Sequence, residues 1–476
     1  MQNEIQPETK APVNSSEYRM ANDNLKSLVM RYSLPTIIGM LVNALYNVVD
    51  RFWVGKIEGE VGLYGLGGIG LCMSIMTMVF AVGQLTGMGA AANISMSLGQ
   101  GDRDRAERIL GNTLTLSSAI SFSVVVVMFI FRRGILNIVG ADDNTFPYAL
   151  EYITIILAGG IFNMVTFSLN HCIRATGNPK RFASTQILGA LINIVLDPIL
   201  IFNFNMGVAG AAYATIIAQF ASAVWVTSYF FTKNAAIRFR LKNLKVKVSE
   251  AVSIISIGVA PFLMQVMGSF IIVIANNSLK FYGARDLSSA TVEESLAGSV
   301  AVSAFTVINS ISTLFVMPVI GINQGSQPII GYNYGARNFE RTREALKWAI
   351  IYSVAICGAG FVIVQLFAPQ LVRFFNEDTM LIETGAVGIR MFLFALPFVG
   401  FQIIASTFFQ SIGHARMSIL LTLLRQAILL APLYLILPRF FGLTGIWAAA
   451  PVSDVCAAAI TFFALRREFK RLGIDT

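Results

Sequence analysis

Long apolar runs, separated by short polar connections, recur along the whole chain. Each run is long enough for a membrane-crossing helix, which needs about 20 residues, and none alternates as the strands of a membrane barrel do. The runs predict twelve membrane-spanning helices, near residues 27–51, 62–98, 109–131, 147–173, 182–204, 208–231, 250–279, 297–330, 345–368, 384–412, 417–440 and 443–465. We therefore expect an all-α membrane protein.

Composition supports this prediction. Of 476 residues, 55% are hydrophobic and only 13% are charged, whereas a soluble domain carries roughly 25% charged residues. The four cysteines lie far apart, in or beside apolar runs, without the spacing of a metal site or a disulfide framework.

The formal net charge of +9 first suggests a nucleic-acid partner, but the positions of the cations point to the membrane. If the N-terminus is cytoplasmic, the connections and tails on that side carry roughly three times as many Lys and Arg residues as the other side. By the positive-inside rule, this bias predicts a multi-pass protein of the inner (plasma) membrane with both termini in the cytoplasm. No nucleic-acid partner is expected.

The second half of the sequence repeats the first. Two stretches carry the repeat: residues 174–215 match 410–450, and residues 99–108 match 332–341. The paired residues are Gly177 and Gly413, Pro198 and Pro432, Gly207 and Gly442, Gly210 and Gly445, Gly101 and Gly335, Arg103 and Arg337, and Pro35 and Pro261. Each half holds six spans, an even number, so both halves have the same orientation and a pseudo-twofold axis along the membrane normal relates them.

This organisation divides the chain into two six-helix lobes. We expect a disordered cytoplasmic tail (1–24), an N-terminal lobe (25–232), a basic cytoplasmic linker (233–248), a C-terminal lobe (249–466) and a second cytoplasmic tail (467–476). The linker alternates basic and apolar residues, as a segment at the membrane interface does. Two bundles joined in this way are typical of a transporter in which one half rocks against the other.

The stretch NIVLDPIL places an acid inside the fifth apolar run. Asn193 and Asp197 are four residues apart and therefore share a helix face. Pro198 has no N–H, so the carbonyl of Ile194 loses its helical partner. A carboxylate, an amide oxygen and a freed carbonyl suit a small cation or a proton, and broken helices serve this purpose in secondary transporters. The alternative is an Asp-Pro hinge satisfied by a neighbouring helix.

A second acid lies at the end of the first span. Asn43, Asn47 and Asp50 share one face of an otherwise apolar helix; the alternative is a membrane-edge acid paired with Arg51. Thr215, in the sixth span, adds a hydroxyl, although alone it would be a packing residue. In the second half, Leu279, Ala431 and Ala450 replace Asp50, Asp197 and Thr215. Because the scaffold is duplicated and the acids are not, chemistry confined to the N-terminal half is favoured.

Other polar residues allow more than one interpretation. Arg390, Arg425 and Asp454 lie in or near apolar runs, and the sequence names no partner for them, so packing and functional roles are equally open. His171 and His414 lie near predicted cytoplasmic connections, and we expect both at the surface.

Taken together, these features resemble the multidrug and toxic compound extrusion (MATE) family, in particular its DNA-damage-inducible-type branch with the staphylococcal multidrug-efflux relatives. SLPTIIGML with VVDRFWVG resembles the family's first span, GNPKRF its fourth cytoplasmic connection, and NIVLDPILIFNFNMGVAGAAYAT its fifth and sixth spans. The resemblance covers residues 25–466. It implies a V-shaped antiporter that expels amphipathic, often cationic compounds in exchange for H⁺ or Na⁺.

The resemblance also implies site residues. Asp50, Asn193, Asp197 and Thr215 match the cation- or proton-binding site of the family. The expected bending points are Pro35, which matches a proline in the first helix, and Pro198. The substrate cavity is expected to include Asn43, Tyr46, Asn47, Asn163 and Gln265. Another branch of the family has carboxylates in the C-terminal lobe, but here Gln265 and Arg390 occupy those spans, so coupling is not expected there.

Two alternatives remain open. A lipid-linked oligosaccharide flippase of the same superfamily would share the topology but line its cavity with cations. An intramembrane enzyme would need a nucleophile–base pair or a metal cluster at membrane depth, and the sequence offers no obvious one. We therefore expect no enzymatic activity, no cofactor, no metal beyond a coupling Na⁺, small amphipathic substrates, a surrounding lipid bilayer and a monomer.

Overall fold

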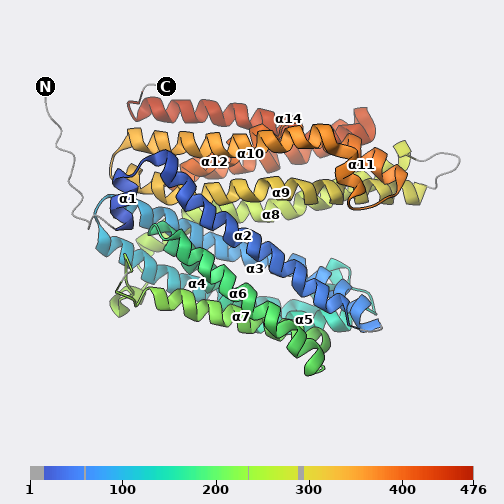
Figure 1. Ribbon diagram of the computed structural model, residues 1–476, viewed down its shortest axis with the longest axis horizontal. Helices are drawn as coiled ribbons and strands as arrows, with labels where there is room; N and C mark the ends of the chain where they lie inside the picture. The colour runs from blue at the N-terminus through green and yellow to red at the C-terminus, as the bar shows by residue number, and fades with distance from the viewer. Residues whose placement is uncertain (1–14, 58–59, 234, 288–293, 475–476) are drawn as a thin grey trace.

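A computed structural model describes residues 15–57, 60–233, 235–287 and 294–474 (Figure 1). Every regular element in these ranges is a helix. The first half holds α1 (Ser16–Asn22), α2 (Leu25–Gly55), α3 (Glu60–Gly99), α4 (Arg103–Val139), α5 (Phe146–Ala175), α6 (Pro179–Pro198), the π-helix η1 (Ile199–Asn203) and α7 (Gly207–Tyr229). The second half holds the 3₁₀-helix η2 (Leu241–Leu244), α8 (Val248–Leu287), α9 (Glu294–Gly335), α10 (Phe339–Arg373), α11 (Thr379–Phe392), α12 (Leu396–Ser411), α13 (Ala415–Leu423), the π-helix η3 (Leu424–Leu430) and α14 (Ala431–Arg471).

The number of membrane spans follows from helix length and one backbone turn. Ten helices in the described residues are long and apolar enough to cross a membrane, and the bent pair α11 and α12, inclined by 47°, adds an eleventh. One of the ten runs from Ala415 to Arg471, and a straight helix of that length would be about 85 Å long, against about 30 Å for the hydrocarbon core. It turns at Gly442, whose φ is 54°, and so supplies two spans. The prediction of twelve spans is confirmed.

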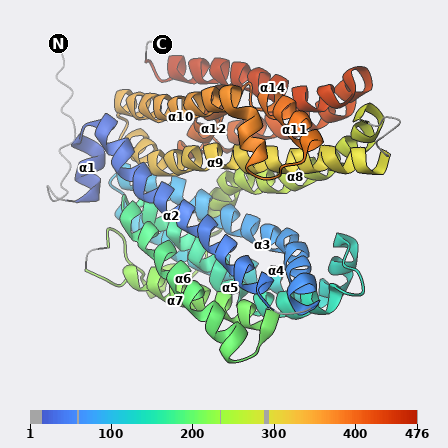
Figure 2. The ribbon, with the colours of Figure 1, turned by 45° about the vertical axis from the view of Figure 1, so that its right-hand side comes forward.

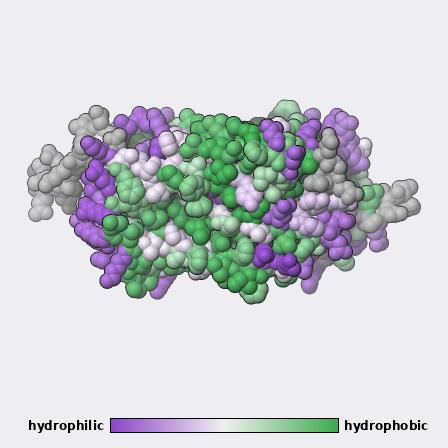
Figure 3. All heavy atoms as spheres, turned by 90° about the horizontal axis from the view of Figure 1, so that it is seen from below, coloured by the Kyte–Doolittle hydropathy of each residue, from purple (hydrophilic) through white to green (hydrophobic). Residues whose placement is uncertain are grey.

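The surface agrees with a position in a bilayer. Seen from below, hydrophobic residues form a broad belt across the middle of the molecule, while hydrophilic residues gather at its two ends (Figure 3). Many large apolar side chains on the helices are exposed, for example Phe122, Ile130 and Phe463. In a lipid solvent such side chains need no protein partner.

The helices form two lobes, as predicted. Helices α2–α7 make the N-terminal lobe and α8–α14 the C-terminal lobe, which lie one above the other in Figure 1. We call the end of the molecule that holds α1 the α1 end. Figure 2 shows the lobes in contact towards the α1 end and diverging towards the opposite end, so that the molecule has a V shape.

At the α1 end, the lobes approach each other at glycines. A Cβ atom at Gly89 of α3 or at Gly258 of α8 would overlap a backbone carbonyl of the other helix. Helix α9 approaches α3 in the same manner, and against α2 its glycines meet the side chain of Ile37 and the backbone of Ser33. The glycines that make these contacts are Gly89, Gly99, Gly258, Gly321, Gly325 and Gly335. Small residues let helix backbones come close, and this closeness stabilises packing in membranes through van der Waals contact.

Backbone geometry agrees with part of the predicted repeat. Gly207 and Gly442, matched by sequence, both have a φ of 54°, while Gly177 and Gly413 have φ values of 77° and 79°. These left-handed conformations are available to glycine at little cost, whereas most side chains disfavour them. The matched glycines therefore start or end equivalent helices in the two lobes.

The alignment of the α3–α4 and α9–α10 connections needs a correction of two residues. The left-handed residue between α3 and α4 is Gly101 (φ 76°), and between α9 and α10 it is Arg337 (φ 59°), so these two are equivalent. Gly99 then corresponds to Gly335. Each of these glycines ends its helix and lies against a backbone carbonyl of the other helix, α9 or α3. The sequence alignment paired identical letters, whereas the backbone turn defines the true register.

Two other predictions are wrong. Part of the tail predicted to be disordered forms α1, because the Ser15 hydroxyl caps its first turn and Met20 is fully buried. His171, expected at the surface, is buried on α5 beside Arg174, which donates hydrogen bonds to His171 Nδ1 and to Gln324 Oε1 of α9. The opposite lobe covers this end of α5, and hydropathy does not reveal such a contact. The other histidine, His414, is partly exposed.

The linker between the lobes is fastened to α4. The side chain of Arg240 lies 2.6 Å from the Glu107 carboxylate, and Asn112 Oδ1 accepts a hydrogen bond from the backbone N–H of Lys247. Thr115 donates to the carbonyl of Leu244 at 2.8 Å. These contacts hold the connection against the N-terminal lobe.

Candidate functional site

The fifth span breaks at the predicted acid. Helix α6 ends at Pro198, directly after Asp197, and the chain continues as the π-helix η1. A π-helix widens the hydrogen-bond ladder by one residue and is found mostly at functional sites. Pro198 explains the change, because it cannot donate the backbone hydrogen bond that an α-helix needs at that position.

Three of the predicted site residues meet between α6 and α7. Asn193 Nδ2 donates a hydrogen bond to Asp197 Oδ1 at 3.1 Å and approaches Thr215 Oγ1 at 3.4 Å. Asp197 is fully buried, and Asn193 and Thr215 are almost so. The i, i+4 spacing thus places the amide and the carboxylate on one face, as the sequence predicts.

The fourth predicted residue, Asp50, reaches the same region from α2. It is buried, and its carboxylate lies close enough to that of Asp197 for the two charges to interact. No ion pair joins it to Arg51 in the described part of the chain, and Arg51 instead approaches the sulfur of Met73. The charge of Arg51 nevertheless acts on the Asp50 carboxylate, so Arg51 belongs to the electrostatic surroundings of this acid.

The oxygen atoms of this cluster are only partly satisfied. Asp50 Oδ1, Asp197 Oδ2 and Asn193 Oδ1 are buried, and none accepts a hydrogen bond from a described residue. Unsatisfied buried oxygens cost free energy, so they call for a cation, a proton or a water molecule as partner. We call Asp50, Asn193, Asp197 and Thr215 the N-lobe acid cluster.

The cluster contains the hard oxygen ligands that Na⁺ accepts, and its two carboxylates can also take up a proton. Within the described residues, no group of three or more His, Cys, Asp and Glu side chains is placed to hold a metal ion.

Sequence reasoning missed Tyr152, which belongs to the same neighbourhood. Its side chain on α5 is almost fully buried and lies within electrostatic range of both Asp50 and Asp197. A tyrosine in an apolar helix is usually a packing residue, and only the arrangement of α2, α5 and α6 brings it to the acids. The one signal in the sequence is that its hydroxyl needs a partner when buried.

The remaining predicted residues are spread over three helices. Asn43 and Tyr46 lie on α2, Asn163 lies on α5 and Gln265 on α8, and none of these four is fully buried. The side chain of Asn47 lies outside the described part of the structure. Helix α2 runs through Pro35 as one helix, and the bending at this residue stays a prediction.

The deep charges of the C-terminal lobe have partners. Arg425 Nε lies 2.6 Å from Asp454 Oδ1, and Ser453 donates to the carbonyl of Arg425 at 2.9 Å. Arg390 is exposed, and it exchanges two hydrogen bonds with Gln365, each between a side chain and a backbone carbonyl. These contacts are the partners that the sequence does not name.

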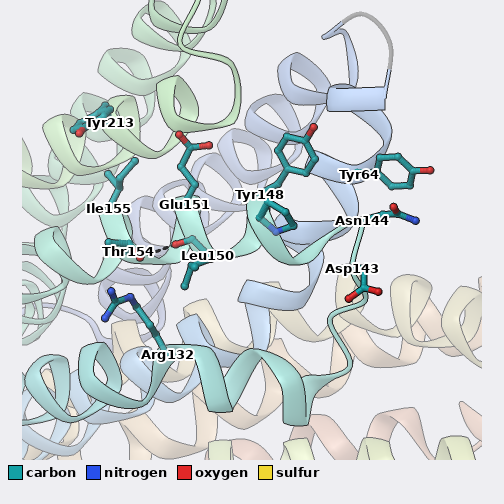
Figure 4. A pocket seen from close by; sticks show the side chains of 11 residues that line it. Tyr64, Arg132, Asp143, Asn144, Tyr148, Leu150, Glu151, Thr154, Ile155 and Tyr213 are labelled. Atoms are coloured by element: carbon teal, nitrogen blue, oxygen red, sulfur yellow. Dashed lines mark hydrogen bonds between the residues drawn. The ribbon is translucent and has the colours of Figure 1, made fainter.

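A cavity of about 820 Å³ lies elsewhere in the N-terminal lobe, away from the predicted substrate residues (Figure 4). Its walls come from α3, α4, α5 and α7. Its lining mixes polar, aromatic and aliphatic residues: Tyr64, Arg132, Asp143, Asn144, Pro147, Tyr148, Leu150, Glu151, Thr154, Ile155 and Tyr213.

Comparison with known proteins decides the family. The MatE family model matches residues 35–199 and 286–436, which hold three members of the acid cluster and most spans of both lobes. The chain belongs to the MATE family of transporters. This MATE transporter is 26% identical over 450 residues to the multidrug export protein MepA of Staphylococcus aureus (strain N315), covering 94% of this chain and 95% of MepA. MepA of Staphylococcus haemolyticus is 25% identical over a similar length.

Solved structures of the family share the fold. A multidrug resistance MATE transporter of the MOP superfamily in an outward-facing conformation superposes with a TM-score of 0.85 at 25% identity, over 96% of this chain and 98% of that one. A MATE protein in a bent conformation gives 0.87 at 26% identity, again over 96% and 98%. The resemblance predicted from sequence motifs is confirmed.

Proposed function

We propose that this transporter is a secondary active multidrug efflux antiporter. It exports amphipathic, often cationic organic compounds in exchange for H⁺ or Na⁺. The observation that carries the proposal is the N-lobe acid cluster, in which three buried oxygens have no donor among the described residues. The names of the staphylococcal relatives, multidrug export proteins, support the substrate class.

We propose further that the α1 end faces the cytoplasm, since the basic connections gather there under the positive-inside rule. The lobes then meet on the cytoplasmic side and diverge towards the outside, which corresponds to an outward-facing state. The lobe boundaries at residues 25–232 and 249–466, joined by the linker, remain part of this proposal. So does a substrate cavity between the lobes that includes Asn43, Tyr46, Asn47, Asn163 and Gln265.

The chemistry of exchange follows from two neighbouring carboxylates. When both are ionised, Asp50 and Asp197 repel each other, and one bound proton or Na⁺ relieves that repulsion. A loaded cluster is less negative and holds a cationic compound less well, so uptake of the coupling ion from outside favours release of the exported compound. The ion-loaded cluster then returns to the inward-facing state and releases the ion to the cytoplasm, and the negative cluster regains affinity for the next molecule.

The flippase alternative has less support. A lipid-linked oligosaccharide carries phosphate, which calls for free cations in the cavity. Of the two candidates, Arg425 is paired with Asp454, and Arg390 bonds Gln365 at an exposed position. An intramembrane enzyme would need a nucleophile and a base in contact, whereas the acids here contact an amide and lie near hydroxyl groups.

The proposal is tested by efflux of a fluorescent organic cation from proteoliposomes with separately imposed proton and sodium gradients. Efflux driven by a proton gradient alone makes the cluster a protonation site, and efflux that requires Na⁺ makes it a coordination site. Efflux under neither gradient, together with binding of a lipid-linked sugar, would establish the flippase instead.

A further inference from the structure

The short helix α1 lies across the seam between the two lobes. On the side of the N-terminal lobe, Ser16 donates a 2.7 Å hydrogen bond to the carbonyl of Thr176, in the connection between α5 and α6. A Cβ atom at Gly177 would lie 2.8 Å from Ser16 and 3.3 Å from Met20, so α1 rests directly on this glycine. Glu17 lies 3.9 Å from Arg103 at the start of α4.

On the other side, α1 is held by the C-terminal lobe. Asn333 of α9 donates a hydrogen bond to the carbonyl of Met20 at 3.1 Å. Arg341 of α10 donates to the carbonyls of Met20 and of Asp23, the residue that ends α1, at 3.3 and 2.8 Å. The Met20 side chain is fully buried and belongs to the main hydrophobic core. Seven helical residues thus contact both lobes.

We propose that α1 is a clasp that stabilises the conformation in which the lobes are closed at the α1 end. This inference rests on the proposed alternating mechanism. Opening at this end must move Thr176 and Gly177 away from Asn333 and Arg341, and α1 is too short to span a widened gap. It must therefore leave one lobe before the other conformation can form.

Both lobes hold α1 with charged and polar contacts. On the C-terminal lobe, Asn333 and Arg341 together donate three hydrogen bonds to backbone carbonyls. On the N-terminal lobe, Ser16 and Met20 rest on Gly177, and Arg31 of α2 lies 3.1 Å from the carboxylate of Asp23. One of the two sets of contacts must break when the lobes separate at this end.

This clasp is not a property of the matched family region. The family model begins at residue 35, beyond α1 and beyond the residues that cap it. The partners on the two lobes also lie at helix ends, where a change of lobe angle produces a large displacement. A segment with these contacts sets the balance between the two conformations without taking part in ion or substrate binding.

The clasp is tested by double electron–electron resonance, which measures distances between spin labels, on the full-length protein in lipid nanodiscs. A label pair at Lys180→Cys and Arg416→Cys reports the α1 end, and a pair at Asp143→Cys and Glu377→Cys reports the opposite end. All four positions are exposed, and Cys456→Ser removes the exposed native thiol. In Met20→Glu, we expect the population with longer distances at the α1 end to grow, with shorter distances at the opposite end. Ser16→Ala should raise that population about fivefold, as expected for loss of one hydrogen bond.

Arg19→Gln is the matched control, because Arg19 is exposed on the same helix and should leave both distributions unchanged. If Met20→Glu does not fold, Ser16→Ala alone decides. If the wild-type distance distributions shift with substrate or coupling ion, but neither α1 substitution changes the distributions, the clasp is wrong and the antiporter proposal stands. A wild-type protein with one fixed distribution under all conditions would overturn the alternating mechanism and the clasp with it.

Discussion

The two lobes treat a buried acid in opposite ways. In the N-terminal lobe, Asp197 on α6 has one oxygen without a donor among the described residues, and a second acid lies nearby. In the C-terminal lobe, Asp454 on α14 is neutralised by Arg425, 2.6 Å away on the π-helix η3. In each lobe, the acid lies where the last two spans meet, and the fifth span of the lobe contains a π-helix: η1 after α6 and η3 after α13.

The difference shows how one scaffold supports two purposes. A buried ion pair already has its countercharge, so it has little affinity for an exchangeable cation. A buried carboxylate without a fixed countercharge is costly unless something mobile arrives, and that cost drives binding. Under the proposed function, the N-lobe acid cluster is the one available for ions, and the repeated scaffold of the C-terminal lobe holds a neutralised pair instead.

The largest effect is expected for Asp197→Asn. The substitution keeps the size and a polar oxygen but removes the charge that the coupling ion neutralises, so ion-driven efflux should fall to background. Transport assays in proteoliposomes measure this, and Asp50→Asn should behave in the same way. Glu151→Gln is the matched control, because it makes the same chemical change at an exposed acid of the same lobe. Wild-type efflux in both Asp variants would show that the N-lobe acid cluster does not couple.

A smaller but still large effect is expected for Arg425→Met, this time on stability. It leaves Asp454 buried without its partner, which should reduce stability by about 3–5 kcal/mol. Thermal unfolding in nanodiscs would show a lower midpoint.

The paired variant Arg425→Met with Asp454→Leu is the control, since replacing a buried ion pair with apolar residues is often neutral. It should recover both stability and efflux. Failure of efflux in a stable paired variant would show that the charges of the C-terminal lobe also take part in transport, and the comparison between the lobes would break.

The smallest effect is expected for Thr215→Val, which keeps the shape and removes the hydroxyl. Loss of one neutral ligand or hydrogen bond costs about 1 kcal/mol, so the ion concentration for half-maximal efflux should rise about fivefold. The concentration dependence of efflux measures this. Thr227→Val, on the same helix, should leave it unchanged, and an equal change in both variants would assign the effect to packing rather than to ion binding.

Much of the fold could be predicted from the sequence because the bilayer restricts it strongly. A spanning helix must be long and apolar, and this requirement alone located all twelve spans. Asn193, Asp197 and Pro198 were also predictable, because their spacing on one helix fixes their relative positions. Their contact with Thr215 needed only the next span along the chain.

What could not be predicted depends on contacts between distant segments. Tyr152 comes to the acids through the packing of α5 against other helices, and Arg174 meets Gln324 from the other lobe. The partner of Arg425 lies 29 residues away across a backbone turn. No local periodicity encodes such pairs, and for the same reason the sequence does not predict α1.

The glycine contacts between the lobes have a consequence for speed. Where α3 meets α8 and α9, backbone lies against backbone, and at Gly89, Gly99, Gly258 and Gly335 no side chain lies between the helices. At these four positions there are no rotamers to rearrange when the lobes part, whereas side-chain contacts such as that of Arg174 with Gln324 must break. Dispersion forces fade within a short distance, so most of the cost of separating these backbones arises at the start of the motion. Beyond that first step, the glycine contacts offer little further resistance to the separation of α3 from α8 and α9.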